Sequence, residues 1–214
     1  MQRFGLVVFD WDGTLVDSLG RIVGAMQSTI AELSLPPRTD DALREGIGLG
    51  FDEVVARLFP ALARADRARV RDSFRDHFLA GGRTAQLFPG ARAALERIAA
   101  GGATLAVATG KGRAGLDREL AETGLADLMV ATRCVDECAS KPAPDMLEQL
   151  MDCTGHARDA TLMVGDSEYD LLMARAARTA AVGVAGGAHA HELLARHAPL
   201  AVVASVAELP PLIL

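Results

Sequence analysis

Polar side chains suited to chemistry gather at four points in this sequence, three of them directly after an apolar segment. The four segments are Asp10-Trp11-Asp12-Gly13-Thr14, Thr109-Gly110-Lys111, Lys141-Pro142 and Gly165-Asp166-Ser167-Glu168-Tyr169-Asp170. Four aspartates brought to one place cannot all stay ionised without compensation. Lys141 supplies one positive charge, and a divalent cation would supply the remainder. The ligands would be oxygens, so the pattern favours Mg²⁺, which prefers carboxylates, water and substrate phosphate.

The elements that must position these side chains are short, continuous apolar runs. These runs are residues 6–9, 104–108, 161–164, 181–184 and 201–203. Continuous rather than alternating apolar residues are typical of strands buried on both faces, as in a parallel sheet. Helical patterns lie between the runs, so we predict an α/β fold with a doubly wound, mainly parallel sheet. Ligands of such sheets bind beyond the carboxyl ends of the strands, where the polar segments lie.

Residues 18–84 break this rhythm and carry only helical patterns. Apolar residues at helical spacing include Ile22, Met26 and Ile30, and the glycine-rich run Gly46-Ile47-Gly48-Leu49-Gly50 interrupts the helices. We therefore predict a small helical unit at 18–84, inserted after the first strand, and an α/β core made of 1–17 and 85–214. The tail, residues 208–214, contains two prolines and is predicted to leave the core.

The order of these motifs resembles the haloacid dehalogenase superfamily. Its pattern is Asp-x-Asp-x-Thr after the first strand, Thr or Ser after the second, a lysine, and then Gly-Asp-x-x-x-Asp. All four pieces occur here in order, and the insertion falls where a large subgroup of the family places its cap. The stretch Phe9 to Ser18 is similar to the phosphoglycolate-phosphatase-like branch. The resemblance therefore covers nearly the whole chain.

The resemblance implies a phosphatase that works through a covalent intermediate. Asp10 would attack phosphorus and form an aspartyl phosphate. Asp12 would protonate the leaving alcohol and then take a proton from the hydrolytic water. The Asp10 carboxylate, the Asp12 main-chain carbonyl and Asp166 would hold Mg²⁺.

The remaining motif residues would handle the phosphoryl group. The resemblance implies that Thr109 and Lys141 bind its oxygens, and that Asp170 orients Lys141 or a water at the metal. The family often has asparagine after the threonine, but this chain has Gly110, whose backbone N–H is still available to phosphate.

Substrate choice is expected to lie in the helical unit, which would close over the site and exclude water. Glycine lets a backbone approach a ligand closely, so Gly48 is predicted to contact a small phosphorylated metabolite such as phosphoglycolate. A plain turn between two helices is the alternative for this loop.

Two other functions stay open. A sugar phosphomutase of the same superfamily is one, although the segment Arg21-Ile22-Val23-Gly24 lacks the histidine typical of that branch. A non-catalytic phosphate-binding module is the other, although such a module would be free to lose Asp10 or Asp12. Asp12 itself argues against dehalogenation, which has no leaving alcohol to protonate.

Composition limits the partners and the location. The chain has 214 residues and a formal net charge of −6, which disfavours nucleic acid as a partner. No apolar run reaches transmembrane length, and the N-terminus lacks the pattern of a signal peptide. We predict a cytoplasmic protein with no membrane partner, present as a monomer or weak homodimer. Its three cysteines are expected to be reduced thiols.

Two side-chain types near the motifs are predicted to play no part in the chemistry. Trp11 lies between two aspartates, and the alternation of side chains would turn it away from the site, so it is predicted to pack. His189 and His191 are predicted to lie in a solvated loop.

Overall fold

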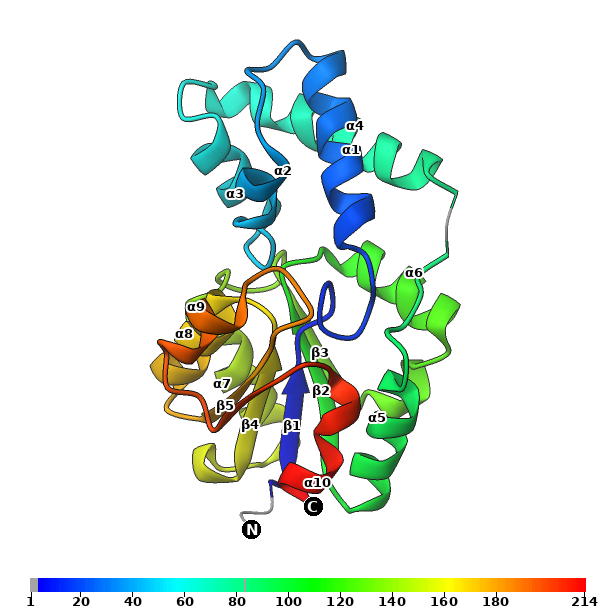
Figure 1. Cartoon of the computed structure of the whole chain (residues 1–214), viewed down its shortest axis with the longest axis vertical. Helices are drawn as coiled ribbons and strands as arrows, with labels where there is room; N and C mark the ends of the chain where they lie inside the picture. The colour runs from blue at the N-terminus through cyan, green and yellow to red at the C-terminus, as the bar shows by residue number, and fades with distance from the viewer. Residues whose placement is uncertain (1–3, 83) are drawn as a thin grey trace.

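Strand β1 (Leu6–Phe9) is an inner strand of the sheet, and all four of its residues are buried. The computed structural model describes residues 4–82 and 84–214. The other strands are β2 (Thr104–Thr109), β3 (Ala131–Cys134), β4 (Thr161–Gly165), β5 (Ala180–Val184) and β6 (Ala201–Val203). Their spatial order is β3-β2-β1-β4-β5-β6, and every neighbouring pair is parallel (Figure 1). The chain thus winds outward from β1 in both directions, which confirms the predicted doubly wound sheet.

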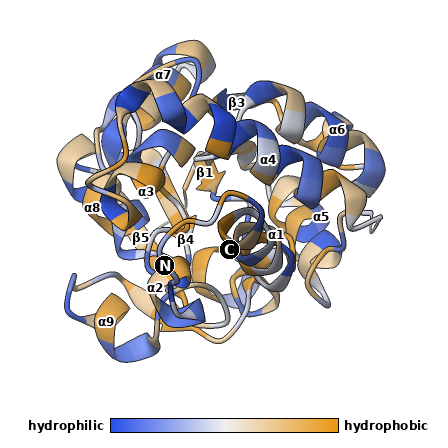
Figure 2. Ribbon diagram, turned by 90° about the horizontal axis from the view of Figure 1, so that it is seen from above, coloured by the Kyte–Doolittle hydropathy of each residue, from blue (hydrophilic) through white to orange (hydrophobic). Residues whose placement is uncertain are grey.

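Helices cover both faces of the sheet (Figure 2). Val7 and Phe9 point to the face that packs on α5 (Ala91–Ala100), α6 (Arg113–Thr123) and α10 (Pro210–Ile213). Leu6 and Val8 point to the opposite face, covered by α7 (Asp145–Thr154) and α8 (Glu168–Ala177), with α9 (His191–Ala195) beside α8. Alternate side chains of one strand therefore reach two separate cores, which is why the run is apolar throughout.

Four helices follow β1 and lie beyond the carboxyl edge of the sheet (Figure 1). They are α1 (Leu19–Glu32), α2 (Asp40–Arg44), α3 (Phe51–Leu58) and α4 (Arg67–Ala80). Val23, Met26 and Ile30 form one apolar stripe of α1, and they belong to a hydrophobic cluster separate from the two cores of the sheet. This arrangement places a helical unit directly above the strand ends. Short 3₁₀ turns occur at Arg64–Asp66, Ala126–Leu128, Arg158–Ala160 and Val206–Glu208.

Strand β3 was missing from the sequence prediction, and its environment explains why. It is the edge strand next to β2, and only Cys134 of its four residues is fully buried. Thr132 and Arg133 are half-exposed, so the segment shows no continuous apolar run. An edge strand of a parallel sheet can therefore escape a search for such runs.

The prediction that the tail leaves the core is wrong. Leu209 and Ile213 are buried in the same core as Phe9, and α10 contacts α5. Pro210 occupies the first turn of α10, where a missing backbone N–H costs no helical hydrogen bond. The two prolines therefore begin a short helix that covers the sheet. Among the helices of the described residues, none combines the length and apolar content that a bilayer crossing needs.

Candidate active site

A fully buried lysine joins two of the strand-end aspartates. Lys141 lies in the loop before α7, and its Nζ is 2.7 Å from Asp10 Oδ1 and 2.6 Å from Asp170 Oδ1. Asp10 follows β1, and Asp170 lies in the first turn of α8. Asp170 is also held by Ser167, whose hydroxyl donates to Oδ2 at 2.6 Å and whose backbone N–H donates at 3.1 Å. The three charges are thus fixed by elements from distant parts of the sequence.

Asp166 stands beside this group at the end of β4. Its Oδ1 accepts a hydrogen bond from Thr14 Oγ1 at 2.7 Å, and its Oδ2 accepts one from the backbone N–H of Ala188 at 2.6 Å. Oxygen atoms of Asp10, Asp166 and Asp170 lie within 4.8 Å of one another, and all three residues are buried. The structure therefore brings together three of the four aspartates that the motifs single out.

The electrostatics of this cluster are unfavourable for the protein alone. Burial, followed by the neighbouring carboxylates Asp170 and Asp166, raises the pKa of Asp10 well above its ordinary value, although Lys141 opposes the shift. Burial and then the charge of Asp170 raise the pKa of Asp166 to about 7. For Lys141, burial alone would lower the pKa, but Asp10 and Asp170 outweigh it and raise the pKa. The lysine is therefore charged, and the aspartates remain undercompensated.

A divalent cation fits this cluster. Three carboxylates against one ammonium leave a formal excess of two negative charges. The possible ligands are oxygens, which suits Mg²⁺. Gly187 packs closely against the Asp166 carboxylate, because a Cβ added at Gly187 would lie 2.1 Å from Asp166 Oδ2. Residues that pack this closely hold the carboxylate in one orientation.

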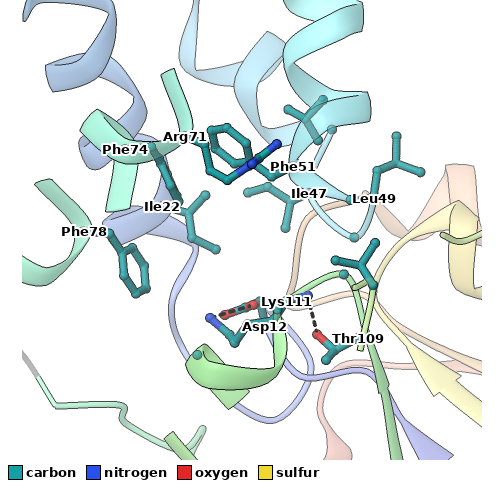
Figure 3. Close-up of a pocket in the computed structure, with 18 of the residues that line it drawn as sticks. Asp12, Ile22, Ile47, Leu49, Phe51, Arg71, Phe74, Phe78, Thr109 and Lys111 are labelled. Atoms are coloured by element: carbon teal, nitrogen blue, oxygen red, sulfur yellow. Dashed lines mark hydrogen bonds and ion pairs between the residues drawn. The ribbon is translucent and has the colours of Figure 1, made fainter. Parts of the chain in front are cut away.

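Asp12 faces a different partner. Its Oδ1 accepts a hydrogen bond from Ser18 Oγ at 2.7 Å, and its Oδ2 lies 3.1 Å from Lys111 Nζ, drawn as a dashed line in Figure 3. Lys111 also lies 3.3 Å from Glu119 Oε1, and Trp11 Nε1 donates to Glu119 Oε2 at 2.7 Å. The Asp12 side chain is therefore held apart from the three clustered carboxylates.

Glu119 is the residue of this network that sequence reasoning missed. It is fully buried on α6 and bonds both Trp11 and Lys111. The only sequence signal was an acidic residue on the apolar side of a helix, which is costly to bury unless it is paired. Trp11 does turn into the core, as alternation predicted, and its indole N–H is what pairs Glu119.

Thr109 ends β2 at the floor of the pocket, and Gly110 follows it. Thr109 is buried, and its Oγ1 accepts a hydrogen bond from the Lys111 backbone N–H at 3.1 Å (Figure 3). A Cβ added at Gly110 would lie 2.6 Å from the Leu49 carbonyl oxygen. The loop of the helical unit therefore leaves no room for a side chain at this position. This explains why the chain has glycine where the family named above often has asparagine.

Gly48 lies where that same loop meets the core. Its φ of +105° is a conformation that residues with a Cβ rarely adopt, and a Cβ here would lie 2.7 Å from Ser167 Oγ. Nearby, the backbone N–H of Gly50 donates to Ser140 Oγ at 2.9 Å. Close packing of loop on core is thus enough to explain the glycine, and contact of Gly48 with substrate stays a prediction.

These elements enclose a pocket of about 800 Å³. Asp10, Asp12 and Thr109 form its floor, and Gly48 and Gly110 also line it. Its opposite wall comes from the helical unit, whose side chains point down toward Asp12 and Lys111 in Figure 3. The pocket therefore spans the strand ends and the helices above them.

The prediction of a solvated loop is wrong for His189. This side chain is buried, its Nδ1 accepts the Glu168 backbone N–H at 2.9 Å, and its ring meets Tyr169 edge-on at 5.7 Å between centroids. It thereby satisfies a free N–H at the start of α8, close to Asp166 and Asp170. His191 is exposed, as expected, but it is the first residue of α9 rather than part of a loop.

Comparison with known proteins identifies the family. The family described as Haloacid dehalogenase-like hydrolase matches residues 7–184. Phosphoglycolate phosphatase of Rhodospirillum rubrum is 38% identical over 217 residues, covering 95% of this chain and 88% of the relative. The phosphoglycolate phosphatase of Yersinia pseudotuberculosis is 34% identical over 215 residues, covering 97% and 92%.

Solved structures agree with this result. A predicted phosphoglycolate phosphatase from Haemophilus somnus matches with a TM-score of 0.89 at 25% identity, covering 100% of both chains. A haloacid dehalogenase-like hydrolase from Bacteroides fragilis matches with a TM-score of 0.89 at 21% identity, covering 97% of this chain and 100% of that one. The chain belongs to the haloacid dehalogenase-like hydrolases. It is an enzyme of the phosphoric monoester hydrolase class, which confirms that part of the prediction.

The raised pKa of Asp166 has a consequence for stability. The pKa is about 7 in the folded protein against an ordinary 3.8, so the folded state holds a proton that the unfolded state releases. Stability should therefore fall as pH rises between about 4 and 7, and the loss should persist above pH 7. We expect Asp166→Asn to raise the melting temperature at pH 8 in chelator by roughly 3 °C or more, and to have little effect at pH 4.

Differential scanning calorimetry of both proteins tests this expectation, with the exposed Asp127→Asn as control. Added Mg²⁺ should raise the melting temperature of the wild type more than that of Asp166→Asn. A variant that is less stable than the wild type at pH 8 without metal would contradict the charge analysis.

Proposed function

We propose that the chain is a Mg²⁺-dependent phosphatase that hydrolyses a small phosphorylated metabolite through an aspartyl phosphate on Asp10. The observation that carries this proposal is the placement of Asp10. It lies at the floor of the pocket, 2.7 Å from a buried lysine and within 4.8 Å of Asp166 and Asp170. A nucleophile in that setting has positive charge beside it and open space before it.

Asp10 would carry out the first step. One of its oxygens forms a bond to phosphorus while the bond from phosphorus to the alcohol oxygen breaks. Lys141 and the Thr109 hydroxyl would bind the phosphoryl oxygens, and the Gly110 backbone N–H would add a third donor. Asp10, Asp166 and the Asp12 carbonyl would hold the cation, which when bound would neutralise charge on the phosphoryl group. Asp170 would position Lys141, as its 2.6 Å contact indicates.

Asp12 would move the protons of both steps. It gives a proton to the leaving alcohol in the first step. In the second step water attacks phosphorus, Asp12 takes a proton from that water, and the Asp10–phosphorus bond breaks to release inorganic phosphate. The contacts of Asp12 with Ser18 at 2.7 Å and Lys111 at 3.1 Å hold its carboxylate at the pocket, apart from the clustered acids.

The four helices between residues 18 and 84 would act as a cap over this site, with 1–17 and 85–214 as the catalytic core. Their position above the strand ends in Figure 1 supports this role. A closed cap would exclude water from the acyl phosphate and limit substrates to small molecules. The names of the relatives make phosphoglycolate the first metabolite to test. The cytoplasmic location and the monomeric or weakly dimeric state stay predictions.

Replacing the nucleophile gives the sharpest kinetic test of the proposal. We expect Asp10→Asn to lower kcat with p-nitrophenyl phosphate by at least about a thousandfold, because an amide is a poor nucleophile and a poorer metal ligand. The exposed Asp17→Asn is the matched control and should stay within about threefold of the wild type. Retention of a tenth of the wild-type activity by Asp10→Asn would remove Asp10 from the nucleophile's role.

Metal exchange tests the cofactor. Activity should require Mg²⁺, vanish in excess chelator and return on adding Mg²⁺. Ca²⁺ should restore little of it, because Ca²⁺ takes more ligands at longer distances and would hold Asp10 in a different position. Equal rates with the two metals, or full activity in chelator, would contradict the proposal.

A further inference from the structure

The wall of the pocket that faces the carboxylates is mostly apolar, although Arg71 also lies in it. Side chains from α1, α3, α4 and the glycine loop point into it (Figure 3), among them Ile22, Ile47, Phe51, Phe74 and Phe78. Ile22, Phe51 and Phe74 are only half-buried, so part of their surface is left facing the pocket. Residues that serve only to hold the helices together, such as Val55 and Val70, are fully buried instead.

The phenylalanines of this wall form a continuous row. The ring centroids of Phe51 and Phe74 are 4.9 Å apart, and those of Phe74 and Phe78 are 5.8 Å apart. Phe78 is the end of the row nearest Asp12. Its ring centroid lies 5.1 Å from Lys111 Nζ, and that same Nζ lies 3.1 Å from Asp12 Oδ2. An alcohol that leaves toward Asp12 would therefore have its carbon chain directed along Phe78 and Phe74.

The cations that line the pocket are already engaged. Among the pocket-lining residues that the structure describes, each basic side chain has an acidic partner. The pairs are Arg71 with Asp52, Arg75 with Asp72, Lys111 with Asp12 and Glu119, and Arg118 with Glu119 and Glu122. Lys111, the cation nearest Asp12, is only 11% exposed, so a substrate carboxylate there would have to compete with Asp12 and Glu119 for its charge. A two-carbon acid would also leave most of the 800 Å³ unfilled.

From these contacts we infer that the preferred substrate is a phosphate monoester of an alcohol bearing an apolar group, aromatic or aliphatic, that packs on the row Phe51, Phe74 and Phe78. The inference rests on the proposed function and narrows its substrate class. Pockets of a few hundred to about a thousand Å³ with apolar walls and a few polar anchors are the usual form of a small-molecule site. Here the anchors would hold the phosphoryl group, and the row would select the alcohol.

A series of alkyl phosphates isolates the apolar wall. Ethyl, butyl and hexyl phosphate have leaving groups of similar basicity, so differences among them report on binding of the chain. With the Mg²⁺-loaded enzyme, kcat/KM should rise about two- to fourfold per methylene, and hexyl phosphate should exceed phosphoglycolate. Phe74→Ala and Ile22→Ala should each flatten the series, lowering kcat/KM for hexyl phosphate about tenfold while ethyl phosphate stays within about twofold.

The control is Leu62→Ala, because Leu62 is a half-buried apolar residue of the same helical unit that does not line the pocket. It should leave the slope of the series unchanged. A flat series in the wild type, or a higher kcat/KM for phosphoglycolate than for hexyl phosphate, would overturn the inference. So would equal losses on ethyl and hexyl phosphate in both pocket variants, since the side chains would then only support the helices.

Binding without turnover separates this inference from the proposed function. Calorimetric affinities for ethyl-, butyl- and hexylphosphonate should also increase with chain length in the Mg²⁺-loaded protein. Chain-dependent binding without hydrolysis of any phosphate ester would uphold the apolar wall and refute the phosphatase mechanism. Hydrolysis of phosphate esters together with chain-independent binding would uphold the phosphatase mechanism and refute the role of the apolar wall.

Discussion

The burial of Lys141 between Asp10 and Asp170 is the constraint on which the rest of the structure depends. A charge without solvent is costly unless partners surround it, and removing either partner leaves an uncompensated ion. Here the partners come from the end of β1 and the start of α8, and the lysine comes from the loop before α7. The ion pairs of Lys141 therefore form only when β1 and β4 lie side by side, as they do in the sheet.

The same cluster works against stability. Burial and mutual repulsion raise the pKa values of Asp10 and Asp166. Without a cation, the folded protein therefore disfavours the ionised form of both carboxyl groups. Hydrogen bonds from Thr14 and the Ala188 backbone hold Asp166 in place despite this. Such tension between stability and chemistry is common where charges are gathered for catalysis. A bound cation would relieve it, so metal binding and folding should be coupled.

Residues that follow fully apolar strands were predictable, because the carboxyl ends of parallel strands meet at one edge. Asp10, Thr109 and Asp166 were found in this way, and the sheet was correct except for the polar edge strand β3. His189 and Glu119 could not be predicted from the sequence, because each is held by a partner distant in sequence, Glu168 and Trp11 respectively. The burial of the tail was not predicted, because two prolines can begin a helix as well as follow the end of one. The apolar wall of the pocket was not predicted, because helical spacing does not distinguish a side chain that fills a core from one that lines a pocket.

In the proposed mechanism, Asp10 carries the phosphoryl group during turnover. Reduction with borohydride tests it directly, since an acyl phosphate is reduced to an alcohol and a phosphorylated aspartate becomes homoserine. The enzyme would be quenched in acid while hydrolysing p-nitrophenyl phosphate, reduced, digested and analysed by tandem mass spectrometry. Homoserine is expected at position 10, dependent on both substrate and Mg²⁺. Unmodified Asp10 during demonstrated turnover, or homoserine at Asp12, Asp166 or Asp170 instead, would contradict it.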